Sequence, residues 1–166
     1  MIHGRSKMTE AQRTKLTENI HPGDRVLEVG TWHGATICML AEAQPEAAFV
    51  SVDIFRHLGP ENWFANRRDN MTVYVGTVQE LRGFAAPESF DLVIVDADHT
   101  YPACYRDLCV AVALVKRDGK IFAHDYDTET HRWPGVIKSV TKFCAKHNWR
   151  VIGSTGTLVE MERGPE

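Results

Sequence analysis

Two clusters of polar side chains could do chemistry, and each follows an apolar run typical of a β-strand. The segment V-D-A-D-H-T-Y at 95–101 places two carboxylates, an imidazole and a phenol after the most apolar run of the chain. The segment A-H-D-Y-D at 123–127 ends the next such run. Burying polar groups is costly, so these clusters indicate a functional site. If the two strands are parallel neighbours, Asp96 and Asp125 face one another across a gap.

Carboxylate oxygens from adjacent strand ends can hold a hard divalent cation such as Mg²⁺ or Mn²⁺. Such a cation would lower the pKa of an acceptor hydroxyl, while a neutral histidine removes its proton. We expect Asp96 and Asp125 to be the metal ligands and His99 to be the base, because the pKa of histidine lies near neutral pH. The alternative is that Asp96 and Asp98 cap the following helix and that His124 is an interior histidine with satisfied hydrogen bonds.

A glycine turn earlier in the chain indicates a ligand site. The run V-L-E-V-G-T-W-H-G-A-T puts Gly30 and Gly34 around a strand-to-helix corner, where a ligand can approach the backbone and the free N–H groups of a helix start. Asp53 ends the second strand, 23 residues after Gly30, where nucleotide-binding α/β domains place an acid for the ribose hydroxyls. The alternatives are an ordinary tight turn and a solvated loop aspartate.

The elements that must position these residues alternate between strands and helices. Apolar and β-branched runs predict strands at 25–30, 48–55, 71–76, 90–96 and 120–125, and a C-terminal hairpin at 149–154 and 156–162. Helical spacing predicts helices at 33–43, 59–70, 102–116, with Gly119 as a stop, and around 136–144. This alternation predicts a doubly wound α/β fold with a mostly parallel sheet, in which ligands gather beyond the carboxyl ends of the strands.

Composition narrows the class of protein. With 166 residues, 43% of them hydrophobic, we expect one domain over 25–166, preceded by an N-terminal arm or short helix at 1–24. The net charge of −3 provides no basic field for nucleic acid, so a nucleic-acid substrate is not expected. The four cysteines form no C-x-x-C pair and are expected to be reduced. No apolar run is long enough for a membrane span or leader, so we expect a cytoplasmic protein.

The motif E-V-G-T-W-H-G resembles the first motif, E/D-x-G-x-x-x-G, of class I S-adenosylmethionine-dependent methyltransferases. V-D-I-F resembles their acidic second motif, and F-D-L-V-I-V-D their fourth-strand motif. The resemblance implies a Rossmann-like, seven-stranded sheet whose final hairpin inserts an antiparallel strand. It implies that Glu28, Gly30 and Gly34 hold the methionine part of the cofactor, Asp53 the ribose and 77–79 the adenine. The cofactor-binding set it implies is Glu28, Gly30, Thr31, Gly34, Asp53, Ile54, Thr77, Val78 and Asp96.

The pattern D-x-D-H-x-Y followed by H-D-Y resembles a group of small methyltransferases that includes macrolide sugar O-methyltransferases and cephalosporin-hydroxylase-like proteins. In their metal-dependent members, the first Asp of D-x-x-H and an acidic pair after the next strand hold the metal, and the histidine is the base. Carried over, these residues are Asp96, Asp125 and His99. This chain departs from the pattern at His124, which replaces the first acid of the pair; either His124 is a ligand or no metal binds.

We therefore expect an S-adenosylmethionine-dependent O-methyltransferase that acts on a small molecule and is assisted by Mg²⁺ or Mn²⁺. Little of the chain is left to form a lid, so either the acceptor is large and binds on an open face or a partner subunit completes the pocket. We therefore expect a homo-oligomer. The alternatives are a module that binds the cofactor without turnover and a hydroxylase-like enzyme on the same scaffold. Aromatic residues that could wall the acceptor pocket, or simply pack in the core, are Trp32, Trp63, Phe64, Tyr101, Tyr126 and Trp133.

Overall fold

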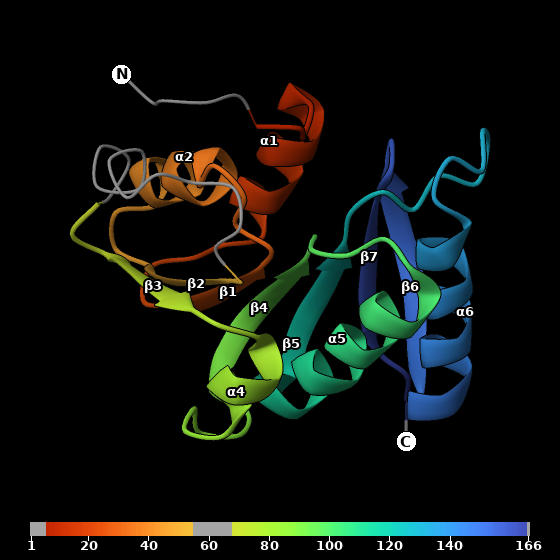
Figure 1. Ribbon diagram of the computed structural model, residues 1–166. Helices are drawn as coiled ribbons and strands as arrows, with labels where there is room; N and C mark the ends of the chain where they lie inside the picture. Colours follow the sequence, from red (N-terminus) through yellow and green to blue (C-terminus); the bar gives the residue numbers. More distant parts are fainter. Residues whose placement is uncertain (1–5, 55–67, 166) are drawn as a thin grey trace.

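The computed structural model describes residues 6–54 and 68–165. Its elements alternate between strands and helices, as the sequence predicts (Figure 1). In chain order they are α1 (Glu10–Glu18), β1 (Arg25–Val29), α2 (Ala35–Ala43), β2 (Ala48–Asp53), β3 (Met71–Val75), α4 (Val78–Arg82), β4 (Phe90–Val95), α5 (Tyr101–Leu114), β5 (Val115–Ala123), α6 (Pro134–His147), β6 (Trp149–Thr155) and β7 (Leu158–Arg163).

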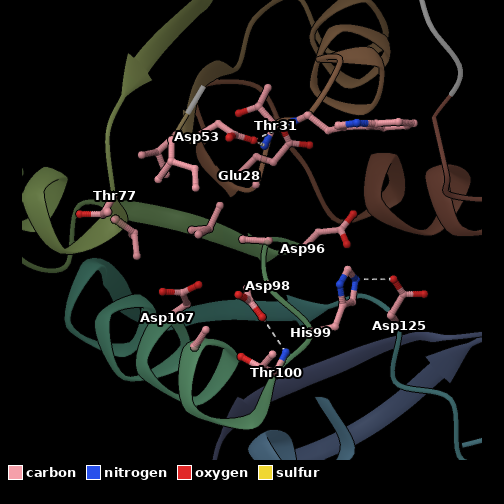
Figure 2. A pocket seen from close by; sticks show the side chains of 18 of the residues that line it. Glu28, Thr31, Asp53, Thr77, Asp96, Asp98, His99, Thr100, Asp107 and Asp125 are labelled. Carbon is pink, nitrogen blue, oxygen red and sulfur yellow. Dashed lines mark hydrogen bonds and ion pairs between the residues drawn. The ribbon is translucent and has the colours of Figure 1, made fainter. Parts of the chain in front are cut away.

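Seven strands form one sheet in the order β3-β2-β1-β4-β5-β7-β6. The first five strands pair in parallel, and β7 pairs antiparallel with both β5 and β6. This confirms the predicted seven-stranded, mostly parallel sheet with an inserted C-terminal hairpin. The strand order reverses between β1 and β4, which is the place where open α/β sheets bind ligands. The polar side chains drawn in Figure 2 gather beyond the carboxyl ends of these strands.

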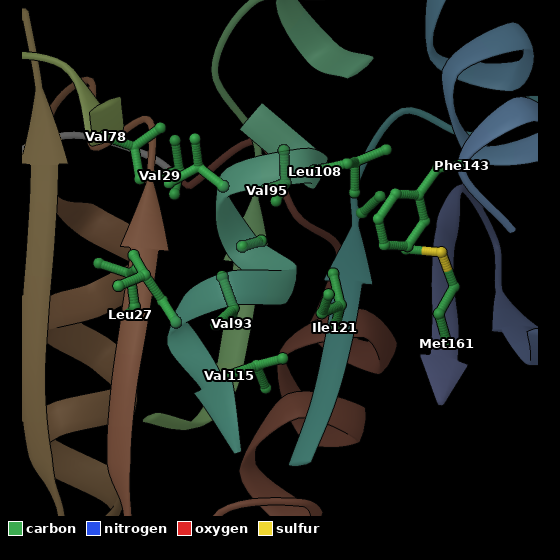
Figure 3. Close-up of a cluster of buried hydrophobic side chains, with 14 of the residues drawn as sticks. Leu27, Val29, Val78, Val93, Val95, Leu108, Val115, Ile121, Phe143 and Met161 are labelled. Carbon is green, nitrogen blue, oxygen red and sulfur yellow. The ribbon is translucent and has the colours of Figure 1, made fainter. Parts of the chain in front are cut away.

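Alternate side chains of the central strands enter two different hydrophobic layers. Leu27 of β1, Val93 of β4 and Ile121 of β5 face the layer that α4, α5 and α6 cover (Figure 3). The intervening residues Val26 and Leu92 belong to the opposite layer, which α1 and α2 cover. Because strand side chains alternate between faces, a continuous apolar run is buried on both sides. The apolar runs of the sequence therefore become the central strands that hold the site rigidly.

The N-terminal segment contributes a helix to one of these layers. Helix α1 begins with a capping box in which the Thr9 hydroxyl accepts from the Gln12 N–H and the Gln12 side chain accepts from the Thr9 N–H. Leu16 and Ile20 of this segment are buried in the same layer as α2. The sequence allows either an arm or a short helix at 1–24, and residues 10–18 form a helix. No helix within the described ranges is long and apolar enough to cross a membrane.

The junction of α5 and β5 differs from the prediction. Gly119 does not stop the helix, which ends at Leu114, and β5 begins at once with the extended residue Val115. A Cβ on Gly119 would lie 2.6 Å from the Asp91 carbonyl oxygen, at the point where the pairing of β4 and β5 shifts register. The glycine therefore permits a close approach of two backbones. The helix predicted at 59–70 lies mostly outside the described residues, as do Trp63 and Phe64.

Candidate active site

A cavity of about 1110 Å³ runs along the carboxyl ends of the parallel strands. It passes β4 and β5 at one side and β2 and β3 at the other (Figure 2). The predicted site residues that line it are Glu28, Gly30, Thr31, Asp53, Ile54, Thr77, Val78, Asp96, His99 and Asp125. Gly34 and His124 are placed beside the cavity rather than in its lining. The structure thus brings both sequence clusters and the glycine turn to one site.

The glycine turn is fixed by backbone geometry. Gly30 has a φ of 95°, and a Cβ there would lie 2.3 Å from the carbonyl oxygen of Asp96. Gly34 has a φ of 71° and begins α2 with no side-chain cap. The first N–H groups of α2 therefore have no capping side chain and face the end of the sheet where the cavity lies. Both glycines are needed, Gly30 for a close approach and Gly34 for its left-handed backbone.

Asp53 closes this turn from the end of β2. Its Oδ2 accepts hydrogen bonds from the backbone N–H groups of Thr31, at 2.7 Å, and Trp32, at 2.8 Å. These contacts fix the carboxylate in the wall of the cavity, beside the exposed side chain of Ile54. Asp53 therefore orders the glycine turn as well as presenting a carboxylate to a ligand.

Glu28 lies beneath the turn and is 2% exposed. The Ser51 hydroxyl donates to its Oε2 at 2.7 Å, and Ser51 also contacts the hydroxyl of Thr31. Burial raises the pKa of Glu28 well above its usual range. Sequence reasoning missed Ser51; the signal was a polar residue inside the apolar run of β2.

The far side of the cavity is formed by the start of α4. Thr77 caps this helix: its hydroxyl accepts from the Glu80 N–H, and Glu80 Oε2 accepts from the Thr77 N–H at 2.7 Å. Val78 is buried, and Gln79 lines the cavity. Gln79 donates from Nε2 to the Asp107 carboxylate of α5 at 2.9 Å. Asp107 also lines the cavity, and no motif of the sequence had indicated it.

At the opposite side, His99 is paired with Asp125. Its Nε2 lies 2.7 Å from Asp125 Oδ2, which joins the loop after β4 to the end of β5 (Figure 2). The hydrogen bond to Asp125 raises the pKa of His99 above its usual value. The indole of Trp133 stacks on the His99 ring with centroids 4.5 Å apart. His99 is therefore oriented from two sides, by a carboxylate and by an aromatic plane.

His124 is 5% exposed and lies between the two predicted metal ligands. Its Nδ1 is 3.2 Å from Asp96 Oδ1 and 3.5 Å from Asp125 Oδ2. Burial favours the neutral ring, but hydrogen bonds to Asp125 and Asp96 raise the pKa of His124 to about 10. Burial also opposes ionisation of Asp125, yet hydrogen bonds from His124 and His99 hold the pKa of that carboxyl well below its usual range. The cluster is thus built from opposite charges.

The same cluster has the donor set of a metal site. Asp96, His124 and Asp125 each offer one ligand atom, and these atoms lie within 4.8 Å of one another. Two carboxylate oxygens with one imidazole nitrogen fit Mn²⁺ better than Mg²⁺, which prefers oxygen ligands alone. The alternative that Asp96 and Asp98 cap the following helix is not observed, because α5 begins after Thr100 with no side-chain cap. Asp98 Oδ1 instead accepts from the Thr100 N–H at 2.7 Å, in the turn before the helix.

Aromatic side chains also line the cavity, and one of them, Trp133, contacts His99. Trp32, Tyr101 and Trp133 line the cavity, whereas Tyr126 does not. Gly135 lets α6 approach the loop of His99 closely, since a Cβ there would lie 2.2 Å from the His99 carbonyl oxygen. Two lining residues that sequence reasoning missed are Ser6 and Lys7. Nothing in the polar N-terminal segment pointed to them.

Comparison with known proteins places this geometry in a family. A model of a methyltransferase domain family matches residues 27–126, from β1 to the loop after β5. Uncharacterized protein R132 of Acanthamoeba polyphaga mimivirus is 21% identical over an alignment of 131 residues, and the match covers 72% of this chain and 58% of that protein. The chain therefore spans little more than half the length of this relative.

Solved structures of low sequence identity share the fold. A candidate O-methyltransferase from Klebsiella pneumoniae has a TM-score of 0.69 at 18% identity, over 98% of this chain and 83% of that one. A candidate caffeoyl-CoA O-methyltransferase from Staphylococcus aureus has a TM-score of 0.73 at 9% identity, over 94% and 84%. The MycE methyltransferase of the mycinamycin pathway, solved with Mg, SAH and mycinamycin VI, has a TM-score of 0.69 at 16% identity, over 91% and 48%.

The family model spans the glycine turn, Asp53, Asp96, His99 and Asp125, which are the residues that the structure gathers around one cavity. The fold of this chain is shared with the methyltransferase structures. The chain belongs to the methyltransferase domain family, among the class I S-adenosylmethionine-dependent methyltransferases.

Proposed function

We propose that this protein transfers the methyl group of S-adenosylmethionine to a hydroxyl oxygen of a small molecule, with His99 as the general base. The observation that carries the proposal is the His99–Asp125 pair, 2.7 Å apart, in the cavity that also contains the glycine turn and Asp53. A protein that only binds the cofactor has no evident use for an oriented base in this place.

The cofactor would lie along the carboxyl ends of the strands. Its methionine part would occupy the turn of Gly30 and Gly34, next to the buried Glu28, and its ribose would lie against Asp53. In this order the sulfonium would lie near Asp96 and His99, at the end of β4. In-line displacement requires the acceptor oxygen, the methyl carbon and the sulfur to be aligned, so the rigid strand ends contribute mainly by positioning.

His99 would remove the acceptor proton. When Nε2–H is directed to Asp125, Nδ1 is the nitrogen that can accept a proton. The acceptor O–H proton moves to this nitrogen, the oxygen forms a bond to the methyl carbon, and the carbon–sulfur bond breaks to leave S-adenosylhomocysteine. Because the base must be neutral and its pKa is raised, we expect activity to increase from neutral to mildly alkaline pH.

A divalent cation, when bound by Asp96, His124 and Asp125, would supply Lewis acidity that lowers the pKa of the acceptor hydroxyl. His124 must lose its proton to become a ligand, and its pKa is about 10. We therefore expect Mn²⁺ affinity to increase by about tenfold for each pH unit between pH 6 and 8, as one proton is displaced. Calorimetry at several pH values would measure this, and a flat pH dependence would exclude His124 as a ligand.

An acceptor screen tests the proposed reaction directly. Phenols, catechols and sugar hydroxyls would be incubated with protein and methyl-labelled S-adenosylmethionine, with Mn²⁺ or with EDTA, and products read by mass spectrometry. The proposal expects a product heavier by one methylene group on oxygen, and it expects His99→Gln to slow its formation by about 10²- to 10⁴-fold. Saturable cofactor binding without transfer to any acceptor would instead support a binding module.

A further inference from the structure

Thr157 lies in the tight turn between β6 and β7, and the proposed chemistry does not use it. Its hydroxyl oxygen is 3.5 Å from Nε2 of His124. Nδ1 of the same ring faces Asp96 and Asp125, at 3.2 and 3.5 Å. His124 is 5% exposed, so its ring has little contact with water. A buried ring nitrogen needs a hydrogen-bond partner within the protein, and the Thr157 hydroxyl provides one for Nε2.

Gln12 of α1 fixes the position of the Thr157 hydroxyl. Gln12 Oε1 accepts from the Thr9 N–H at 2.8 Å, and a backbone N–H can only donate. The amide must therefore turn its NH₂ group the other way, and Nε2 donates to Thr157 Oγ1 at 3.1 Å. The carbonyl oxygen of Thr157 accepts from the Tyr126 N–H at 2.9 Å. The turn is thus held by α1 on one side and by the loop after β5 on the other.

The need for this hydroxyl follows from the proposed cation site, on which the inference rests and in which Nδ1 of His124 is a ligand. When Nδ1 of a neutral imidazole holds a cation, the ring proton must be on Nε2. A hydroxyl oxygen has two lone pairs, and Gln12 uses one of those on Thr157, so the other can accept the Nε2–H. Metal-binding histidines generally donate their second N–H in this way, which fixes the orientation of the ring.

We propose that Thr157 is a positioning residue for the cation site, which accepts the Nε2–H of His124 and so directs Nδ1 at the bound ion. The methyltransferases that the sequence resembles have an acidic residue where this chain has His124. A carboxylate carries no N–H to be placed, so the need for an acceptor arises from the histidine. Through Gln12, the first turn of α1 also becomes part of the support of the site.

The test measures Mn²⁺ binding to the full chain by calorimetry at one fixed pH. Thr157→Val keeps nearly the same shape but cannot accept a hydrogen bond, so the Mn²⁺ affinity should fall by about 10- to 100-fold. Thr157→Ser keeps the hydroxyl and should stay within about threefold of wild type. Thr155→Val, at the end of β6, is the matched control, and it should change the affinity by less than about twofold. Thr157→Ala removes the same acceptor and repeats the test without the valine side chain.

Two further measurements separate a positioning role from a merely structural one. Mn²⁺ bound to an imidazole nitrogen shows a nitrogen coupling in pulsed electron paramagnetic resonance. Wild type and Thr157→Ser should show this coupling, and Thr157→Val should weaken or lose it. In a His124→Gln background, Thr157→Val should not lower the Mn²⁺ affinity further, because no imidazole is left to orient. The affinity for S-adenosylhomocysteine should stay within about twofold in every variant, which confirms that the fold is retained.

The possible failures have different meanings. If Thr157→Val keeps the Mn²⁺ affinity and the nitrogen coupling of wild type, or lowers the affinity equally in the His124→Gln background, the inference is wrong. Wild type that binds S-adenosylhomocysteine but not Mn²⁺ also overturns it, and leaves methyl transfer with His99 as the base unaffected. Folded wild type that does not bind S-adenosylhomocysteine overturns the proposed function itself.

Discussion

The two sides of the cavity are built in different ways. The cofactor side, formed by Glu28, Gly30, Gly34 and Asp53, is held by backbone conformation and by hydrogen bonds to N–H and O–H donors. The chemical side, formed by Asp96, His99, His124 and Asp125, is held by charge, with two imidazoles alternating with two carboxylates. Both sides meet where β1 and β4 are neighbours, and a Cβ on Gly30 would strike Asp96.

This difference suggests that one side of the cavity binds the cofactor and the other side transfers a proton. A site held by backbone geometry depends less on pH than a site held by charge, which suits binding of one invariant cofactor. A site held by opposite charges changes its protonation when a cation or an acceptor arrives, which suits proton transfer. Substitutions on the cofactor side should therefore alter affinity or folding, and substitutions on the chemical side should alter turnover and the response to pH.

The largest expected effect is on turnover. His99→Gln keeps a hydrogen-bonding group next to Asp125 but removes the base, so methyl transfer to an acceptor found by the screen should fall by about 10²- to 10⁴-fold. The dissociation constant of S-adenosylhomocysteine should stay within about twofold of wild type. An equal loss of turnover and cofactor affinity would contradict the division between the two sides.

Gly30→Ala should be the most destabilising change on the cofactor side. The added Cβ meets the Asp96 carbonyl at 2.3 Å and the backbone has a φ of 95°, so we expect a loss of about 3 kcal/mol or more in the free energy of unfolding. Urea denaturation measures this. Gly153→Ala is the control, because nothing lies within 4 Å of the added atom, and it should change stability by less than about 1 kcal/mol.

Asp125→Asn should destabilise the chemical side in a pH-dependent way. The pKa of Asp125 is lowered in the folded protein, so its stabilising contribution is present above the ordinary aspartate pKa and is lost as pH falls. We expect the variant to be less stable by about 1–2 kcal/mol at pH 7 and the difference to shrink as pH falls below about 4. A difference that does not depend on pH would mean that the charge of Asp125 does not stabilise the cluster.

Glu28→Gln should have the smallest effect and the opposite sign. Burial raises the pKa of Glu28 in the folded protein. Ionisation of Glu28 therefore lowers the free energy of unfolding, and this loss grows as pH rises above the ordinary glutamate pKa. The amide removes that cost and can still accept from the Ser51 hydroxyl. Thermal melts from pH 5 to pH 8 should show the variant gaining on wild type as pH rises. Destabilisation at every pH would show that the carboxylate charge is compensated within the fold.

The fold could be predicted largely from local patterns. Runs such as 90–96 are apolar on both faces because a central parallel strand is covered twice, and the structure confirms them as strands. The junction after α5 could not be predicted, because the close approach of Gly119 to Asp91 depends on a register shift between two strands. The sequence does not distinguish a glycine that ends a helix from a glycine that lets a neighbouring backbone approach closely.

The site was predictable where residues follow strand ends, and less so elsewhere. Asp53, Asp96, His99 and Asp125 follow strands that a parallel sheet brings to one edge, and the structure places them around one cavity. Asp107 is spaced as an ordinary helix residue, and only the packing of α5 against α4 turns it towards the cavity. Contacts between helix faces leave no local signature in a single sequence.

The most direct test of the account is calorimetric titration of S-adenosylhomocysteine into wild type, Asp53→Asn and His99→Gln. Saturable binding to wild type, weakened by about tenfold or more in Asp53→Asn and unchanged in His99→Gln, is the result that the account predicts. Absence of binding to correctly folded wild type, or equal losses in both variants, would contradict it.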